Sequence, residues 1–391
     1  MNETKTKVLI LHTSVGHGIK VTAVNIGEKL EAAGNYEVRV EDVQKIIGGR
    51  SNTAVEKIYL RILEKFAFIW GFLYSSKLVL WLGLPLRKTI AGLKSKNVLK
   101  LLRQFQPAIV ISTQTVSTGI VAYLKSKKLY RGSLVAVFSD FHTHRFWIYD
   151  EVDLYLCVTA EQAGDLSALG IPKQKIAVTG MILAEKFVRH MDKDQAKSDL
   201  GLLNSMPVVL LFNGARPRME VKEMFMRFLR SPRSFQILAV CANNEQLKLE
   251  LEKISPPAPH PVKILGYADN MEVLMAASDV LVGKTGGPTM GEALLKKLPI
   301  VLTDVQPGHE QMNLDYLVRY KIAQYARNPS EALFFIEQIL DGKFRKDWTH
   351  ARSKLIEPIG VESVTEAIER IIPIETIKSG NLTVKNYQET I

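Results

Sequence analysis

The feature that most constrains this fold is a repeated alternation of short apolar runs with longer amphipathic segments. The apolar run at 8–11 is followed by apolar residues at helical spacing: Ile19, Ala23, Ile26 and Leu30. The pattern predicts further strands at 36–40, 108–112, 134–139, 154–158 and 176–178, with helical stretches between most of them. Strands that alternate with helices over short connections are typical of a parallel sheet covered by helices on both faces.

The alternation starts again after a polar, charged segment at 190–206, which we interpret as a linker. It predicts strands at 208–212, 235–241, 262–265, 280–282 and 300–303. We therefore predict an α/β protein with two Rossmann-like domains, whose loops beyond the carboxyl ends of the strands face a central cleft. The expected domains are 1–195 and 196–360, and a C-terminal helix and tail at 361–391 should pack back on the first domain.

Composition excludes several classes of protein. With 47% hydrophobic and 23% charged residues, the chain is neither disordered nor fibrous. Its only cysteines, Cys157 and Cys241, lie in apolar strand-like runs, which excludes a disulfide-stapled scaffold and indicates a reducing compartment. The polar start at 1–7 predicts no signal peptide.

The net charge of +11 is concentrated in one stretch, 50–103, which has eleven Lys and Arg residues and only two Glu. Such a patch favours an anionic partner, either a membrane surface or nucleic acid. The insertion at 51–106 also contains aromatic residues, Trp70 and Trp81 among them, but its uncharged runs are shorter than the ~20 residues of a spanning helix. We favour a helix in the membrane interface, with an ordinary crossover helix as the alternative. Nucleic acid is disfavoured because the aromatic residues lie within apolar runs.

A first candidate loop, Gly16-His17-Gly18, follows a strand and opens a helix. Backbone amides in such a turn face an anion or a developing negative charge. Val21 stands where a dinucleotide fingerprint needs its third glycine, and where a P-loop needs Ser or Thr after Lys20. The loop is therefore neither of these motifs.

The stronger motif is a glycine-rich turn between a strand and a helix. Gly286 and Gly287 allow backbone amides to approach a phosphate closely, and Thr289 adds a hydroxyl. Pro288 suits the first helical position, and Glu292, one turn further on, can accept both hydroxyls of a ribose. A capped helix with an acid in its first turn is the alternative interpretation.

The loop after the next predicted strand has the same arrangement. Gly308 precedes a polar helix start, and His309, Glu310 and Asn313 are expected to point into the same cleft. Two consecutive polar loops of this kind indicate a shared ligand site.

Together these motifs resemble a known family. Gly286-Gly-Pro-Thr, Glu292-Ala-Leu and Pro307-Gly-His-Glu-x-x-Asn313 resemble the C-terminal half of the diacylglycerol glycosyltransferases, which include the monogalactosyldiacylglycerol synthases of plastids and the processive glucosyltransferases of bacteria. The similarity to the N-acetylglucosaminyltransferase of lipid II synthesis is more distant. In the N-terminal half Ser139-Asp-Phe-x-x-His144-x-x-Trp147 and Glu151-Val-Asp153 agree, and the resemblance spans roughly 7–325.

The resemblance implies a GT-B fold with a UDP-sugar donor, UDP-glucose or UDP-galactose, in the C-terminal domain. It implies a lipid acceptor, diacylglycerol, at the N-terminal domain. No cofactor or metal is expected, because helix amides neutralise the leaving diphosphate, and His142 and His144 are interpreted as polar cleft residues. Further donor-site candidates are Asn213, Gly214, Arg216, Gly266 and Tyr267, and the candidates for acceptor and membrane contact are Trp70, Trp81 and Trp147.

The catalytic residues are where the chain departs from the family pattern. The family's loop histidine is Ile19 here, and the nearest histidine is His17. We predict His17 as the general base with Asp140 in support, and Asp140 alone or His144 as the alternatives. His309 stands where the family has a glutamine at the donor sugar, so the choice of sugar stays open.

The sequence thus predicts an inverting hexosyltransferase that acts on diacylglycerol at an anionic membrane surface, as a peripheral protein on the cytoplasmic face, without nucleic acid. Two related activities remain as alternatives, transfer to a polyprenyl lipid and epimerisation of a UDP-sugar at carbon 2. A membrane-surface binding protein with a degenerate active site is the alternative outside enzymes.

Overall fold

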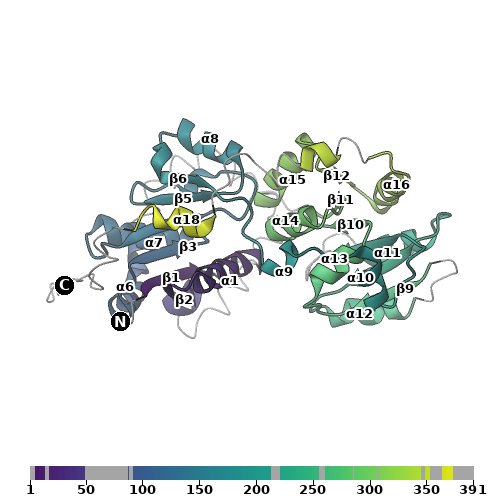
Figure 1. The fold of residues 1–391 in the computed structure, drawn as a ribbon, viewed down its shortest axis with the longest axis horizontal. Coiled ribbons are helices and arrows are strands. Elements are labelled where there is room, and N and C mark those ends of the chain that lie inside the picture. The colour runs from purple at the N-terminus through teal and green to yellow at the C-terminus, as the bar shows by residue number, and fades with distance from the viewer. Residues whose placement is uncertain are drawn as a thin grey trace. The chain divides into compact units, whose positions relative to one another are not determined.

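The structure is a computed structural model that describes residues 5–13, 17–48, 87, 91–212, 221–254, 260–284, 286–305, 308–344, 348–352 and 363–372. The chain divides into two compact units (Figure 1). Unit 1 comprises Met1–Ile182 and Pro358–Ile391, and unit 2 comprises Leu183–Glu357. The boundary therefore lies at residue 182, earlier than the 195 expected from the sequence.

Unit 1 contains a six-stranded parallel sheet in the order β2-β1-β3-β4-β5-β6. The strands are β1 (Thr6–His12), β2 (Tyr36–Asp42), β3 (Ile109–Ser112), β4 (Ser133–Val137), β5 (Leu154–Cys157) and β6 (Ile176–Val178). All six correspond to strands predicted from the apolar runs.

The helical elements of unit 1 connect these strands. They are α1 (His17–Ala32), α2 (Val43–Gly48), α6 (Ser95–Phe105), α7 (Thr115–Ser126), the 3-10 turn η2 (Arg145–Trp147), α8 (Ala160–Ala168), the 3-10 turn η3 (Lys173–Lys175) and α18 (Val364–Glu369). The helical spacing read from the sequence places Ala23, Ile26 and Leu30 of α1 in the core, where they are fully buried against the sheet.

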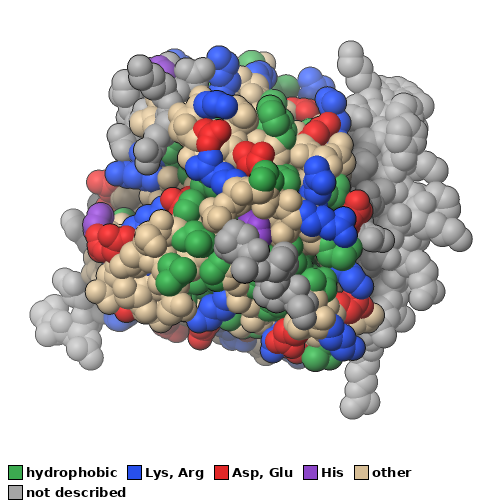
Figure 2. Space-filling view, turned by 90° about the vertical axis from the view of Figure 1, so that its right-hand side faces the viewer, with side chains coloured by type: hydrophobic (Ala, Val, Ile, Leu, Met, Phe, Trp, Pro, Cys, Tyr) green, Lys and Arg blue, Asp and Glu red, His purple; other side chains and the backbone are tan. Residues whose placement is uncertain are grey.

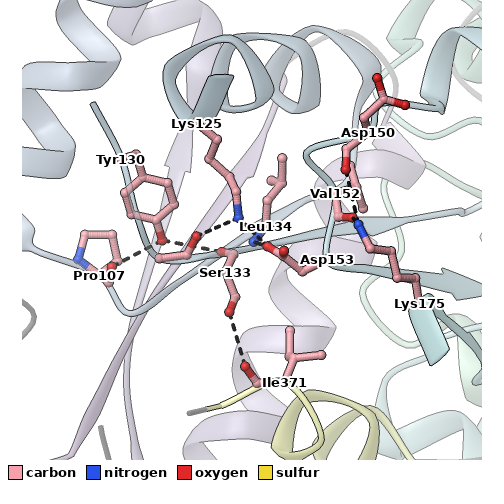
Figure 3. Close-up of polar contacts among 11 residues, drawn as sticks. Pro107, Lys125, Tyr130, Ser133, Leu134, Asp150, Val152, Asp153, Lys175 and Ile371 are labelled. Carbon is pink, nitrogen blue, oxygen red and sulfur yellow. Dashed lines mark hydrogen bonds and ion pairs between the residues drawn. The ribbon is translucent and has the colours of Figure 1, made fainter. Parts of the chain in front are cut away.

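The C-terminal helix α18 belongs to unit 1, where it lies among the N-terminal elements (Figure 1). Ser363 and Glu366 form a capping box at its start, and Val364, Ala367 and Ile368 join the same buried cluster as the strands. Just beyond the helix, the Ser133 hydroxyl donates to the carbonyl of Ile371 at 3.3 Å (Figure 3). Both apolar and polar contacts thus attach this segment to the sheet of unit 1, and the polar contact joins residues 238 positions apart.

Unit 2 repeats the architecture with the strand order β12-β11-β10-β7-β8-β9, again fully parallel. Its strands are β7 (Val208–Phe212), β8 (Gln236–Val240), β9 (Val262–Leu265), β10 (Val280–Gly283), β11 (Ile300–Leu302) and β12 (Ala323–Tyr325). Its helices are α9 (Glu185–Val188), α10 (Lys193–Asp199), α11 (Val221–Leu229), α12 (Glu245–Glu252), α13 (Met271–Ala277), α14 (Gly287–Leu295), α15 (His309–Arg319) and α16 (Pro329–Leu340).

Two elements of unit 2 differ from the sequence prediction. The segment interpreted as a linker contains helix α10, capped by the Asp192 side chain, which accepts from the amide of Gln195 at 2.9 Å. The ammonium of its buried Lys197 donates to the carbonyls of Asn204 and Met206 at 3.3 and 3.0 Å. Strand β12, which has only three residues, was not predicted at all.

Candidate functional site

The strand order locates a candidate ligand site in each unit. In unit 1 the order reverses between β1 and β3, and in unit 2 between β10 and β7. Ligands of open parallel sheets bind beyond the carboxyl ends of the strands at such switch points. The glycine loop before α1 follows β1, and the glycine-rich turn before α14 follows β10. Both motifs chosen from the sequence therefore lie at a switch point.

The turn between β10 and α14 exposes helix amides. Gly286 is the N-cap of α14, so Pro288 takes the second helical position rather than the expected first. The amides of Gly287 and Thr289 belong to the first turn and have no acceptor within the helix. Gly286 has ordinary backbone angles (φ −71°, ψ 122°), and a Cβ added there would meet nothing closer than Thr289 Oγ1 at 3.9 Å. Nothing in the described part of the chain thus requires a glycine at this position.

Glu292 is partly buried in α14 and has an unusual ionisation. Burial raises the pKa of its carboxyl to about 8, Lys186 opposes the rise, and the negative charge of Glu272 adds to it. Lys186 of α9 itself pairs with Glu272 of α13 at 2.9 Å. With this pKa, the Glu292 carboxyl holds its proton at neutral pH when no ligand is bound.

The start of α15 contributes the buried carboxylate of an ion pair. Gly308, the N-cap of α15, has φ +107°, a conformation in which a side chain would be strained. Glu310 is 4% exposed, and its carboxylate accepts from the ammonium of Lys284 at 3.1 Å. Asn313 is fully buried, whereas His309 is exposed. The pair joins the loops that follow β10 and β11.

Lys284 was missed by the sequence analysis. It directly follows β10, so it stands between the strand and the glycine-rich turn. The signal available in the sequence was a lysine immediately before a turn that is expected to bind phosphate. Its pairing with Glu310, 26 positions later, depends on the tertiary fold.

The remaining donor-site candidates lie at the ends of β9 and β7. Gly266 and Tyr267 follow β9, and Tyr267 is 65% exposed, so its ring is available to a planar ligand. Asn213, Gly214 and Arg216 follow β7 but lie outside the described residues.

In unit 1, the structure brings the loop after β4 next to the switch point, because β4 is the neighbour of β3. Asp140 is partly exposed in this loop. His144 is 7% exposed, and its Nδ1 accepts from the amide of Phe146 at 3.3 Å as the cap of η2. A neutral ring in this arrangement carries its proton on Nε2 and is a donor there, which suits positioning better than proton abstraction.

His17 begins α1 at the end of the first glycine loop, and the position of its side chain lies outside the described part of the structure. The turn it belongs to is tied to β3, because the Thr113 hydroxyl donates to the carbonyl of Ile19 at 3.2 Å. Trp147 of η2 packs on Phe138 with ring centroids 5.3 Å apart. Trp70 and Trp81 lie outside the described residues.

Comparison with known proteins shows which family the chain resembles. Residues 17–183 match the family model described as monogalactosyldiacylglycerol (MGDG) synthase. The chain is 28% identical over 379 residues to monogalactosyldiacylglycerol synthase 2, chloroplastic, of Arabidopsis thaliana, covering 93% of this chain and 80% of that protein. It is 25% identical over 395 residues to a processive diacylglycerol beta-glucosyltransferase of Bacillus cereus, covering 97% of each. The chain is thus similar to the MGDG synthase family in this matched segment and to these two relatives over most of its length. The resemblance noted in the sequence is thereby confirmed.

Solved structures confirm the GT-B fold of this chain. MurG of Acinetobacter baumannii matches with a TM-score of 0.59 at 9% identity, over 96% of this chain and 99% of that one. A UDP-N-acetylglucosamine 2-epimerase matches with a TM-score of 0.52 at 13% identity, over 96% and 97%. A transferase and an epimerase therefore share this fold, and the fold alone does not separate those two activities.

One motif of the MGDG synthase resemblance has a structural explanation. Asp153, from Glu151-Val-Asp153, lies at the amino end of β5, away from the candidate site. It accepts from the amide of Leu134 at 2.7 Å and pairs with the ammonium of Lys125 (Figure 3). Beside it, Lys175 donates to the carbonyls of Asp150 and Val152 (Figure 3). These contacts fix the starts of β4 and β5.

Two features are absent from the residues that the structure describes. No group of three or more His, Cys, Asp or Glu side chains lies together there in a way that could hold a metal ion. Among the helices described, none is both long and apolar enough to cross a bilayer.

Proposed function

We propose that this hexosyltransferase moves a hexose from UDP-glucose or UDP-galactose to diacylglycerol at an anionic membrane surface, with inversion at the anomeric carbon. The observation that carries the proposal is the β10–α14 turn, which presents helix amides at a switch point and has no internal need for Gly286. The named activities of the two relatives, which act on diacylglycerol, support the acceptor.

The proposed site for the UDP-sugar rests on the positive charge at the start of α14. A leaving diphosphate develops negative charge, and the amides of Gly287 and Thr289 at the positive end of α14 stabilise it without a metal. Lys284 adds a cation beside the same turn, where Glu310 holds its ammonium. Ribose hydroxyls donating to Glu292 favour the deprotonated carboxyl, so nucleotide binding should release the proton that Glu292 holds in the free protein.

In the proposed reaction, the general base that acts on the acceptor comes from unit 1. A general base removes the proton of the acceptor hydroxyl while the oxygen attacks the anomeric carbon in line and UDP leaves. His17 with Asp140 in support is our proposed assignment. His144 is better suited to fixing the loop, because its Nδ1 already accepts from Phe146.

Peripheral membrane binding is proposed from α6. Its apolar side, Val98, Leu101 and Leu102, is buried, and four cations at its start and along its outer side are exposed: Lys94, Lys96, Lys100 and Arg103. By contrast, the face shown in Figure 2 mixes cationic and anionic side chains. A cluster of one sign attracts anionic lipid, whereas a mixed surface does not.

The test is sugar transfer itself. The protein is incubated with radiolabelled UDP-glucose or UDP-galactose and with vesicles that contain diacylglycerol and anionic phospholipid, in the presence of EDTA. We expect a labelled glycolipid of β configuration from at least one donor. Parallel vesicles with a polyprenyl phosphate test the related acceptor. Label confined to that lipid, or UDP release without any labelled lipid, would contradict the proposal.

A further inference from the structure

The candidate catalytic loop between β4 and η2 is held by one buried side chain from another element. Gln162 lies in the first turn of α8 and is 1% exposed. Its amide nitrogen donates to the carbonyl of Asp140 and to the carbonyl of His142, both at 2.8 Å. Its amide oxygen accepts from the backbone amides of Val158 and Thr159 at 2.7 and 3.2 Å. All four hydrogen-bonding positions of the side chain are therefore used.

Helix capping explains only half of this arrangement. Gln162 completes a capping box with Thr159, which requires just an acceptor oxygen at the third helical position. Glutamate satisfies a capping box equally well. A carboxylate, however, has no hydrogen to donate to the carbonyls of Asp140 and His142. The donor side of the amide thus serves the loop and not the helix.

Buried side chains also anchor this loop before, between and after these two residues. Phe138 and Phe141 are 4% and 3% exposed, and His144 caps η2. Asp140 and His142 lie between these anchors and are partly exposed. The two hydrogen bonds from Gln162 hold the backbone of both residues directly.

We propose that Gln162 is a positioning residue for sugar transfer: it holds the backbone of Asp140 and His142 so that the Asp140 carboxylate and its neighbours meet the acceptor hydroxyl. This inference rests on the proposed function, which places the acceptor at this loop. A misplacement of about 1 Å at a reacting group can lower a rate by about a hundredfold.

The test is Gln162→Glu, which keeps the shape and the capping box but removes the amide donors. We expect kcat with diacylglycerol vesicles to fall roughly 10- to 100-fold, while the KM for the UDP-sugar, bound in unit 2, stays within about twofold of the wild-type value. A protonated carboxyl donates one hydrogen bond. The kcat ratio of variant to wild type should therefore recover in part as the pH is lowered from 8 to 6, a signature that lost stability alone does not produce.

Gln236→Glu is the matched control. Gln236 is also 1% exposed, and its amide likewise bonds backbone groups, accepting from Leu203 at 2.8 Å and donating to the carbonyls of Leu203 and Met206 at 2.9 and 3.1 Å. It lies at the amino end of β8, away from the candidate loops. This variant should lower the Tm without lowering kcat. If Gln162→Glu does not fold at neutral pH, Gln162→Met removes the same donors without adding a charge.

The outcomes separate the two proposals. No transfer by the wild-type protein would contradict the proposed function and this inference with it. Transfer by the wild type, with kcat of the Gln162 variants unchanged or lowered no more than in the Gln236 control, would overturn the positioning role alone.

Discussion

At the scale of single residues, Gly283 and Gly286 of unit 2 lack a side chain for different reasons. A Cβ on Gly283 would overlap the carbonyl oxygen of Phe212 on the neighbouring strand, so this glycine is required by the sheet. Among the described residues, none would crowd a Cβ on Gly286, so we attribute its lack of a side chain to the approach of the proposed donor diphosphate. The two positions therefore allow a paired test.

We predict that Gly286→Ala raises the KM for the UDP-sugar about tenfold, equivalent to about 1.4 kcal/mol, and leaves the Tm nearly unchanged. Gly283→Ala should instead lower the Tm clearly, because the backbone must move. Thermal unfolding and donor titration of both variants measure this. Equal loss of Tm in the two variants, with the donor KM unaffected in Gly286→Ala, would show that both glycines are structural.

Glu292 provides the second residue-scale prediction. Removal of the proposed ribose contact in Glu292→Ala should raise the donor KM by roughly 10- to 150-fold, the equivalent of about 1.5–3 kcal/mol for a charged hydrogen bond. Because the carboxyl has a pKa of about 8 in the free protein, UDP affinity of the wild type should increase from pH 6 to pH 9. The UDP affinity of Glu292→Gln should not change over this pH range. Calorimetric titration with UDP distinguishes these profiles.

The same pKa has a consequence for stability. The folded-state pKa lies above the ordinary value, so the folded protein binds this proton more tightly than the unfolded chain does. The stabilisation is complete below the unfolded pKa of about 4.3 and is lost as the pH rises through about 8. The free energy of unfolding of Glu292→Gln, measured relative to that of the wild type, should therefore increase from pH 5 to pH 9. A difference that does not vary with pH would mean that Glu292 is ionised throughout.

The general base is tested by His17→Ala and Asp140→Asn, assayed at saturating donor. Loss of a general base lowers kcat by about 10²–10⁴-fold, and we expect this loss for His17→Ala and a smaller one for Asp140→Asn. Circular dichroism checks that both variants are folded. If kcat survives in His17→Ala and collapses in Asp140→Asn, the carboxylate is the base.

At the scale of elements, α6 carries the membrane prediction. Reversal of Lys94, Lys96, Lys100 and Arg103 to Glu should abolish sedimentation with anionic vesicles at low salt. Wild-type binding should weaken as the ionic strength rises, since exposed charges are screened over ~10 Å at 0.1 M. Reversal of four exposed lysines of unit 2, Lys222, Lys253, Lys297 and Lys343, is the control with the same change in net charge. Equal loss of binding in both variants would mean that total charge, not α6, drives association.

The elements also show what the sequence could and could not predict. Strands such as β6 and β7 were predicted residue for residue, because each is an apolar run bounded by polar or turn-forming residues. Helix α10 was missed, since its stability comes from the Asp192 cap and from the buried ammonium of Lys197 rather than from an apolar stripe. Strand β12 is too short to show a pattern of its own and exists because β11 lies beside it.

The candidate site divides in the same way. Loops that follow strands were predictable, because glycine, proline and polar residues mark them in the sequence. The Lys284–Glu310 pair and the contacts of Gln162 with Asp140 and His142 were not, because each joins residues 20 or more positions apart that only the fold brings together.

At the scale of the whole molecule, the two units have separate cores, and the chain returns to unit 1 to complete the first one. Ile368 of α18 and Ile336 of α16 are both fully buried, the former in the core of unit 1 and the latter in that of unit 2. Truncation of a buried isoleucine to alanine costs about 2–5 kcal/mol. This matched pair tests whether the units are also separate in stability.

We predict that Ile368→Ala lowers the unfolding transition of unit 1 and that Ile336→Ala lowers that of unit 2. Because UDP is proposed to bind unit 2, it should raise the transition lowered in Ile336→Ala and leave the one lowered in Ile368→Ala unchanged, since a ligand stabilises only the folded state that it binds. Calorimetry of the full chain with and without UDP measures both transitions. A single transition that both variants lower and UDP raises equally would show that the two units unfold as one. If UDP instead raised only the transition that Ile368→Ala lowers, the donor site would have to lie in unit 1.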